Sequence, residues 1–158
     1  MSNLNSAKRV LVTGGSRGIG SAIVRSLAAS GYDVQFVYNS SKEPAQALLQ
    51  ELRDAHGEQN FSAHKVDLGA RAAVDDFAGQ LSEQDTFYAF VHNAGQSYDT
   101  LAALVDQTRA EAIMQVNFWS LTRLITALVR PMTRARSGRI VNIGSVTALP
   151  GVTGNSIY

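Results

Sequence analysis

A glycine-rich stretch near the start of the chain is the first feature with a chemical use. Residues 10–12 are β-branched or aliphatic, which predicts a short strand buried on both faces. Gly14, Gly18 and Gly20 follow at once, and a helical pattern of apolar residues opens at Ile19. This succession points a helix N-terminus, with its free N–H groups and positive dipole end, at an anion such as a phosphate. Gly14 permits the tight turn, Gly18 leaves room for the phosphate, and Gly20 lets the helix approach the strand.

The spacing of these glycines departs from both the G-x-G-x-x-G dinucleotide fingerprint and the P-loop. By itself it also fits an ordinary glycine turn between a strand and a helix. The nucleotide-binding hypothesis therefore depends on the rest of the chain.

Polar residues stand directly after each predicted strand. They are Thr13, Asn39, Asp67, Asn93 and Ser145. The carboxyl ends of parallel strands meet at one edge of a sheet, where ligands of such folds bind. The sequence therefore predicts one ligand site built from all five strand ends.

The elements that must position these residues follow an alternating pattern. Short apolar runs at 10–12, 34–38, 61–66, 87–91 and 139–143 predict strands, and amphipathic helices lie between them, the last from about 109 to 134. This alternation predicts right-handed βαβ units, and thus an α/β fold with a doubly wound parallel sheet of the Rossmann type. We expect one domain, residues 9–158, after a polar leader at 1–8.

Composition excludes several classes of function. The formal charge of +1 gives no case for nucleic acid as a partner, and the chain has no cysteine for a disulfide or thiolate site. His56, His64 and His92 have no second ligand at metal spacing, so no metal site is predicted. The leader has no apolar core of a signal peptide, and no apolar run approaches the length of a membrane span. These features predict a cytoplasmic protein.

The loop after the second strand bears on which dinucleotide is preferred. An acidic residue usually stands there to bind the ribose hydroxyls of NAD, but residues 38–41 read Tyr-Asn-Ser-Ser and no acid precedes Glu43. Arg17 in the glycine turn and this polar loop can bind a 2′-phosphate. We therefore predict NADP(H); the alternative is a solvated loop beside a surface arginine.

Three further polar residues each have two interpretations. Asn117 lies on the apolar stripe of the long helix, so its amide is either a bracket to backbone or part of a site. Ser145 is either a turn cap or a reacting group. Tyr158, thirteen residues later, is either a packing residue or its partner.

Taken together, these motifs resemble the short-chain dehydrogenase/reductase family, and among its members the 3-oxoacyl-acyl-carrier-protein reductases of fatty-acid synthesis. The likeness runs from about residue 8 to Tyr158, with His92 where the family usually has the first Asn of Asn-Asn-Ala-Gly. With the glycine turn and the polar loop, the predicted cofactor-binding residues are Gly14, Ser16, Arg17, Gly18, Ile19, Gly20, Asn39, Ser40, Asp67, Leu68, Asn93, Ala94 and Gly95. The resemblance implies that Asn117, Ser145 and Tyr158 are catalytic.

The resemblance implies an NADPH-dependent ketoreductase acting on a 3-oxoacyl thioester. A serine hydroxyl and a tyrosine phenol suit a ketone oxygen that gains negative charge, and the family lowers the phenol pKa with a lysine four residues further on. Other alcohols or ketones remain alternative substrates, and a non-catalytic dinucleotide-binding protein is the alternative from a different class. A methyltransferase fits the Asn-Ala-Gly and Ser–Tyr motifs poorly.

The chain ends at Tyr158, before that lysine and the family's last strands and substrate cover. We therefore expect a C-terminally truncated, inactive piece of a longer reductase, with its fifth strand an uncovered apolar edge. The resemblance implies a homotetramer formed through the long helix. It also makes Arg136, in a basic cluster with Arg130, Arg134 and Arg139, a candidate contact for the carrier protein; the alternative is a solvated basic face.

Overall fold

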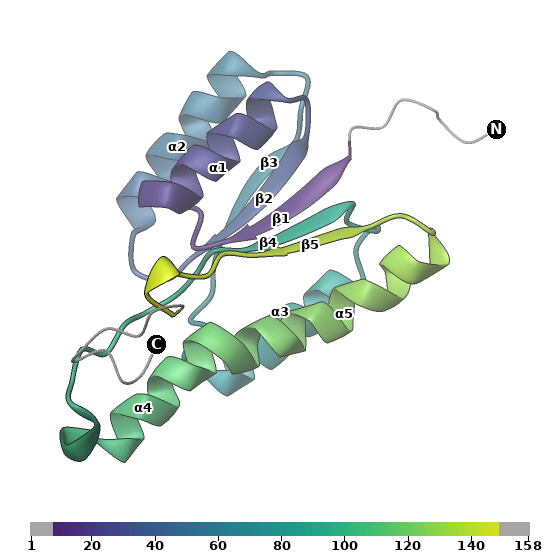
Figure 1. Cartoon of the computed structure of the whole chain (residues 1–158). Helices are drawn as coiled ribbons and strands as arrows, with labels where there is room; N and C mark the ends of the chain where they lie inside the picture. The colour runs from purple at the N-terminus through teal and green to yellow at the C-terminus, as the bar shows by residue number, and fades with distance from the viewer. Residues whose placement is uncertain (1–7, 149–158) are drawn as a thin grey trace.

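The computed structural model describes residues 8–148, which form a parallel sheet between two layers of helices (Figure 1). The strands are β1 (Arg9–Thr13), β2 (Asp33–Tyr38), β3 (Phe61–Lys65), β4 (Ala89–His92) and β5 (Arg139–Asn142). Their order is β3-β2-β1-β4-β5, and every neighbouring pair is parallel. From β1 the chain adds β2 and β3 on one side of the sheet and then β4 and β5 on the other. This strand order confirms the predicted doubly wound α/β fold.

The helices divide between the two faces of this sheet. On one face lie α1 (Gly18–Ala29) and α2 (Lys42–Ala55); on the other lie α3 (Arg71–Ser82), α4 (Gln107–Met114) and α5 (Ser120–Arg134) (Figure 1). The short turns η1 (Ala102–Leu104), η2 (Gln115–Trp119) and η3 (Val146–Ala148) complete the described elements.

Two apolar cores hold the layers together because successive strand residues face opposite sides. Leu11 of β1 packs with Phe90, Leu124 and Leu128 on the α3–α5 side. Its neighbours Val10 and Val12 pack on the α1–α2 side. All three β1 residues are fully buried, as the unbroken apolar run predicts.

The predicted long helix is correct in extent but not in regularity. The helical run from α4 to α5 contains η2, a five-residue π turn centred on Asn117. Single π turns inside helices are often found at functional sites. The sequence does not predict this π turn, because the apolar residues on both sides of it keep the spacing of an ordinary α-helix.

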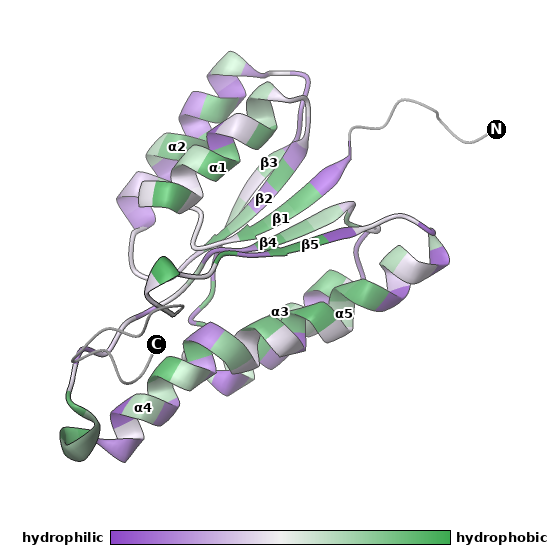
Figure 2. Ribbon diagram, in the orientation of Figure 1, coloured by the Kyte–Doolittle hydropathy of each residue, from purple (hydrophilic) through white to green (hydrophobic). Residues whose placement is uncertain are grey.

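Strand β5 is an edge of the described sheet, as expected. It pairs with β4 alone, and Ile140 and Val141, on opposite faces, are 40% and 44% exposed. Hydrophobic residues run along β5 as they do along the buried strands (Figure 2). An apolar edge strand of this kind is a surface on which further chain can pair.

Contrary to the expectation from the sequence, the helical run Gln107–Arg134 is long and apolar enough to resemble a membrane span by length and composition alone. A core helix of a globular domain has the same character. Here Leu124, Leu128 and Met132 pack against the sheet and α3, which accounts for the apolar stripe.

Candidate functional site

The glycine turn after β1 has the backbone that the spacing predicts. Gly14 adopts a φ of +65° and Gly18 a φ of +52°, in the left-handed region that favours glycine. A Cβ on Gly20 would overlap the Gly14 carbonyl oxygen, so glycine alone lets α1 start this close to β1. A Cβ on Gly18 would meet no atom within 4 Å, so the turn is open on that side.

Thr13 and Asn93 tie this turn to the end of β4. The buried Thr13 Oγ1 accepts hydrogen bonds from the backbone N–H groups of Asn93, at 3.2 Å, and Ala94, at 3.3 Å. In return, Asn93 Nδ2 donates to the Gly14 carbonyl at 3.1 Å. These three hydrogen bonds hold the glycine turn and the end of β4 together, and we call the joined segments the wall. The strand-end position of Thr13 is predictable from the sequence, whereas its anchoring role is not.

His92, the last residue of β4, lies beneath this wall. It is buried, and its Nδ1 lies 3.0 Å from Thr13 Oγ1. Burial lowers the pKa of His92 to about 4, against a smaller opposing effect of the Val116 carbonyl. The imidazole is therefore neutral at physiological pH.

A cleft of about 360 Å³ opens above these strand ends. Every predicted cofactor-binding residue lines it except Gly18, Ile19 and Gly20. Gly20 lies against the Gly14 carbonyl, and Ile19 is an exposed residue at the start of α1. Lining residues that the sequence analysis missed are Val37, Tyr38, Ser41, Val66, Gly69, Gln96 and Val116. Most adjoin predicted residues in the chain, whereas Val116 joins them only through the fold.

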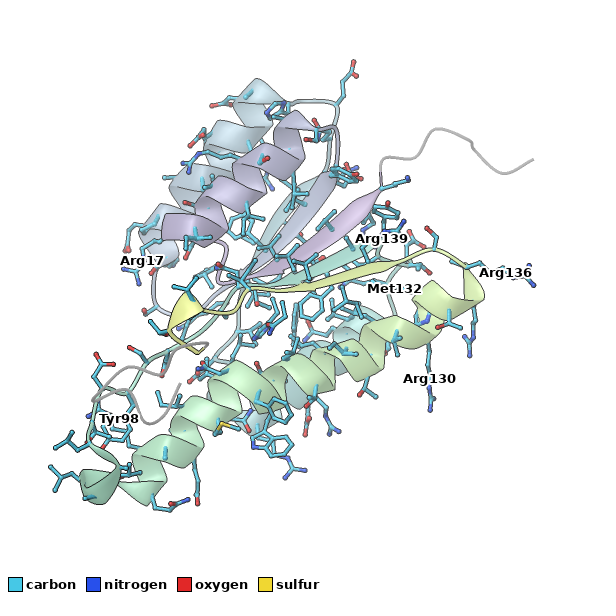
Figure 3. The ribbon with its side chains drawn as sticks, in the orientation of Figure 1. Arg17, Tyr98, Arg130, Met132, Arg136 and Arg139 are labelled. Atoms are coloured by element: carbon cyan, nitrogen blue, oxygen red, sulfur yellow. The ribbon has the colours of Figure 1, made fainter. Side chains whose placement is uncertain are left out.

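The rim of the cleft is polar on the side of β2 and β3. Asn39 Nδ2 donates to Asp67 Oδ1 at 3.4 Å, and the same oxygen accepts the Gly69 N–H at 2.9 Å. Arg17 projects from the N-terminal end of α1 (Figure 3). Its guanidinium is exposed and has no acidic neighbour among the ion pairs of residues 8–148. It is therefore free to meet an anion at the rim.

Asn117 is a bracket to backbone. Its Oδ1 accepts from Gln96 N at 2.9 Å, and its Nδ2 donates to Gln96 O at 2.8 Å. Within the same π turn, the Val116 carbonyl accepts from Ser120 Oγ at 2.7 Å. The turn therefore fixes Gln96 in the cleft wall.

Ser145 follows β5 and caps a short turn. Its Oγ accepts from Thr147 N at 3.2 Å and lies 2.7 Å from Thr147 Oγ1. The cap interpretation therefore describes Ser145 as the structure has it, and its contact with a substrate stays a prediction. Tyr158 lies outside the described residues. Residues 8–148 hold no group of three His, Asp or Glu side chains able to bind a metal.

The family described as short chain dehydrogenase matches residues 8–158 of the chain. The chain belongs to this family. A 3-oxoacyl-acyl-carrier-protein reductase of Chlamydia trachomatis is 36% identical over 162 aligned positions, covering 100% of the chain and 63% of the relative. A reductase of the same name from Staphylococcus aureus is 33% identical, covering 96% of the chain and 61% of the relative. The chain thus spans about 60% of the length of these family members.

Solved structures of family members share the fold. A short-chain dehydrogenase from Sphingobium yanoikuyae, in complex with NADPH, superposes with a TM-score of 0.88 at 31% identity, covering 96% of the chain and 59% of that protein. A metagenomic short-chain oxidoreductase in complex with NADP gives 0.86 at 29% identity, covering 96% and 68%. These findings confirm the predicted family and its Rossmann-type fold.

Proposed function

We propose that the protein is an NADP(H)-dependent oxidoreductase whose dinucleotide lies in the cleft above the strand ends. The observation that carries this proposal is the glycine turn, which aims the N-terminus of α1 at a cleft with no acid after β2. The chain's similarity to structures in complex with NADPH and NADP supports the same choice. In this arrangement Arg17, Asn39 and Ser40 hold the 2′-phosphate.

The proposed substrate is a 3-oxoacyl thioester linked to acyl carrier protein, reduced to the 3-hydroxyacyl form. Support comes from reductases of that name that are 36% and 33% identical to the chain. Bound NADPH supplies the hydride for the ketone carbon. Ser145 donates a hydrogen bond to the ketone oxygen as negative charge develops on it, and the Tyr158 phenol donates the proton. Asn117 holds Gln96 in the wall and, in this proposal, a water of the proton path.

Assembly and carrier binding belong to the same proposal. The outer side of η2 and α5 exposes Phe118, Trp119 and Val129, with Trp119 54% exposed, which supports a tetramer formed through the long helix. Arg136 points away from the sheet at the far end of α5 (Figure 3). An exposed cation there suits an acidic carrier protein. A cytoplasmic location fits a chain without cysteine.

Replacement of Arg17 tests the cofactor proposal on the full gene product. We expect Arg17→Ala to weaken NADPH binding at least about tenfold, because a charge-assisted phosphate contact is worth about 1.5–3 kcal/mol, and to leave NADH binding within about twofold. Fluorescence titration with both dinucleotides measures this. Arg130→Ala, remote from the cleft on α5, is the control.

Acetoacetyl thioester reduction by the same protein tests the activity. If the wild type binds NADPH but reduces neither carrier-linked nor free thioester, the non-catalytic alternative replaces the reductase. Binding of neither dinucleotide rejects the whole proposal.

A further inference from the structure

His92 is a buried titratable side chain at a crowded point of the fold. The residue is 2% exposed at the carboxyl end of β4, between Thr13 of β1 and Asn142 of β5 in the sheet register. Its backbone carbonyl accepts the Ile143 N–H at 2.8 Å. The side chain is thus enclosed by the strands that carry the cleft.

The hydrogen bonds of Thr13 determine which ring nitrogen of His92 carries the proton. A hydroxyl oxygen has two lone pairs and one proton. Both lone pairs of Thr13 Oγ1 are used by the N–H groups of Asn93 and Ala94. The hydroxyl proton is then left for His92 Nδ1, at 3.0 Å, which must accept it. A proton on Nδ1 would instead compete with the two amides for the same lone pairs.

The other ring nitrogen is consistent with this assignment. Nε2 then carries the ring proton, is buried and has no hydrogen-bond partner among residues 8–148. The Val116 carbonyl, which raises the pKa of His92 slightly, has two lone pairs and gives only one of them to Ser120 Oγ. An acceptor on that side of the ring favours a proton on Nε2.

We propose that His92 is a positioning residue for the cofactor cleft: its Nδ1 accepts the Thr13 hydroxyl proton and so directs both lone pairs of that oxygen at the Asn93 and Ala94 amides. The inference rests on the proposed function only for its effect on cofactor binding. Its structural part, the neutral Nε2-protonated ring and the fixed Thr13 hydroxyl, stands independently. Asn93 and Ala94 line the cleft, so their placement sets its shape.

Two substitutions of His92 can test this role. Asn Oδ1 and His Nδ1 occupy the same place on their side chains, and both accept a hydrogen bond. His92→Asn therefore keeps the acceptor and removes the outer half of the ring. His92→Leu keeps much of the volume and removes the acceptor. The pair separates hydrogen bonding from packing.

The test compares these two variants of the full gene product by NADPH titration and by thermal unfolding. We expect His92→Asn to bind NADPH within about threefold of the wild type and His92→Leu to bind at least about fivefold more weakly, because the Thr13 proton then has no acceptor. Equal affinity of His92→Leu and the wild type, or equal loss in both variants, overturns the proposal. A His92→Leu variant that does not fold leaves the decision to the measurement below.

Nitrogen-15 NMR of the wild-type ring decides the structural part without cofactor. We expect the neutral tautomer with its proton on Nε2, and Thr13→Val to change the Nδ1 signal and shift the Asn93 and Ala94 amide signals. A proton on Nδ1, or a charged ring at pH 7, overturns the proposal. A wild type that binds no NADPH but shows the Nε2 tautomer rejects the proposed function and leaves the positioning of Thr13 intact.

Discussion

The glycine turn after β1 contains a residue that tolerates no larger side chain. Gly20 is that residue, because any Cβ there overlaps the carbonyl oxygen of Gly14 and crowds Asn93 Nδ2. Gly79 in α3 is the opposite case, since a Cβ would meet no atom within 4 Å. The two glycines therefore form a matched pair for mutation.

We expect Gly20→Ala to push the start of α1 away from β1, to destabilise the fold by about 1–3 kcal/mol and to weaken dinucleotide binding at least tenfold. Gly79→Ala is expected to stabilise the fold by about 0.5–1 kcal/mol without changing binding, because glycine is unfavourable inside a helix. Urea unfolding and NADPH titration measure both. Normal binding by Gly20→Ala would show that the turn does not set the site.

The lowered pKa of His92 predicts an acid-side loss of stability. The pKa of this residue is 6.5 in the unfolded chain and about 4 in the folded chain. Between these two pH values the unfolded chain binds a proton at His92 and the folded chain does not. The contribution of neutral His92 to the free energy of unfolding is therefore fully present above pH 6.5. It falls by on the order of 3 kcal/mol as pH drops toward 4. Below pH 4 this residue contributes no further change.

The measurement is urea unfolding at a series of pH values for the wild type and His92→Asn. The difference between the two curves isolates His92, because the half-buried His64, whose pKa is also lowered by desolvation, is present in both. Parallel curves from pH 7 to 4 would contradict the assignment.

At the scale of elements, the end of α5 combines strain with a proposed contact. Arg136 adopts a φ of +50°, a conformation that costs a non-glycine residue about 1–2 kcal/mol, while its N–H bonds the Thr133 carbonyl at 3.1 Å. Glycine is the usual residue at this position of a helix end. An arginine there is consistent with a use for the charge.

We expect Arg136→Gly to raise the melting temperature by about 2–4 °C, since relief of strain outweighs the added freedom of the unfolded chain. Arg130→Gly, inside the helix, is the control and should lower it by a similar amount. At low salt, Arg136→Gly should also slow reduction of a carrier-linked substrate but not of a free thioester. If the wild type and Arg136→Gly reduce the carrier-linked substrate at equal rates, Arg136 does not contact the carrier protein.

Most elements follow from the sequence because their signals are local. The apolar run at residues 10–12 and the glycines after it predict β1 and the start of α1 directly. The π turn at Asn117 has no such signal, because the helix periodicity continues through it. Asn117 itself stood out as an amide on an apolar stripe, but only the fold shows that it brackets Gln96.

At the scale of the whole molecule, β5 leaves the sheet with an apolar edge. We expect the 158-residue chain, produced alone, to self-associate with rising concentration, because Ile140 and Val141 are exposed on a strand that pairs on one side only within residues 8–148. Ile140→Lys should reduce this, since a charge on an edge strand opposes pairing. Size-exclusion chromatography over a range of concentrations measures both, and a wild type monomeric at all of them would contradict the expectation.

The sequence by itself determined the α/β class, the strand-end positions of Thr13, Asn39, Asp67, Asn93 and Ser145, and the glycine turn, because short-range spacing and periodicity encode them. Only the tertiary structure decided what holds the cleft in shape. The bonds that do so join Thr13 to His92, Asn93 and Ala94 across 79 to 81 positions of the chain. A contact between residues so far apart leaves no periodic trace in either segment, and exists only once β1 and β4 lie side by side.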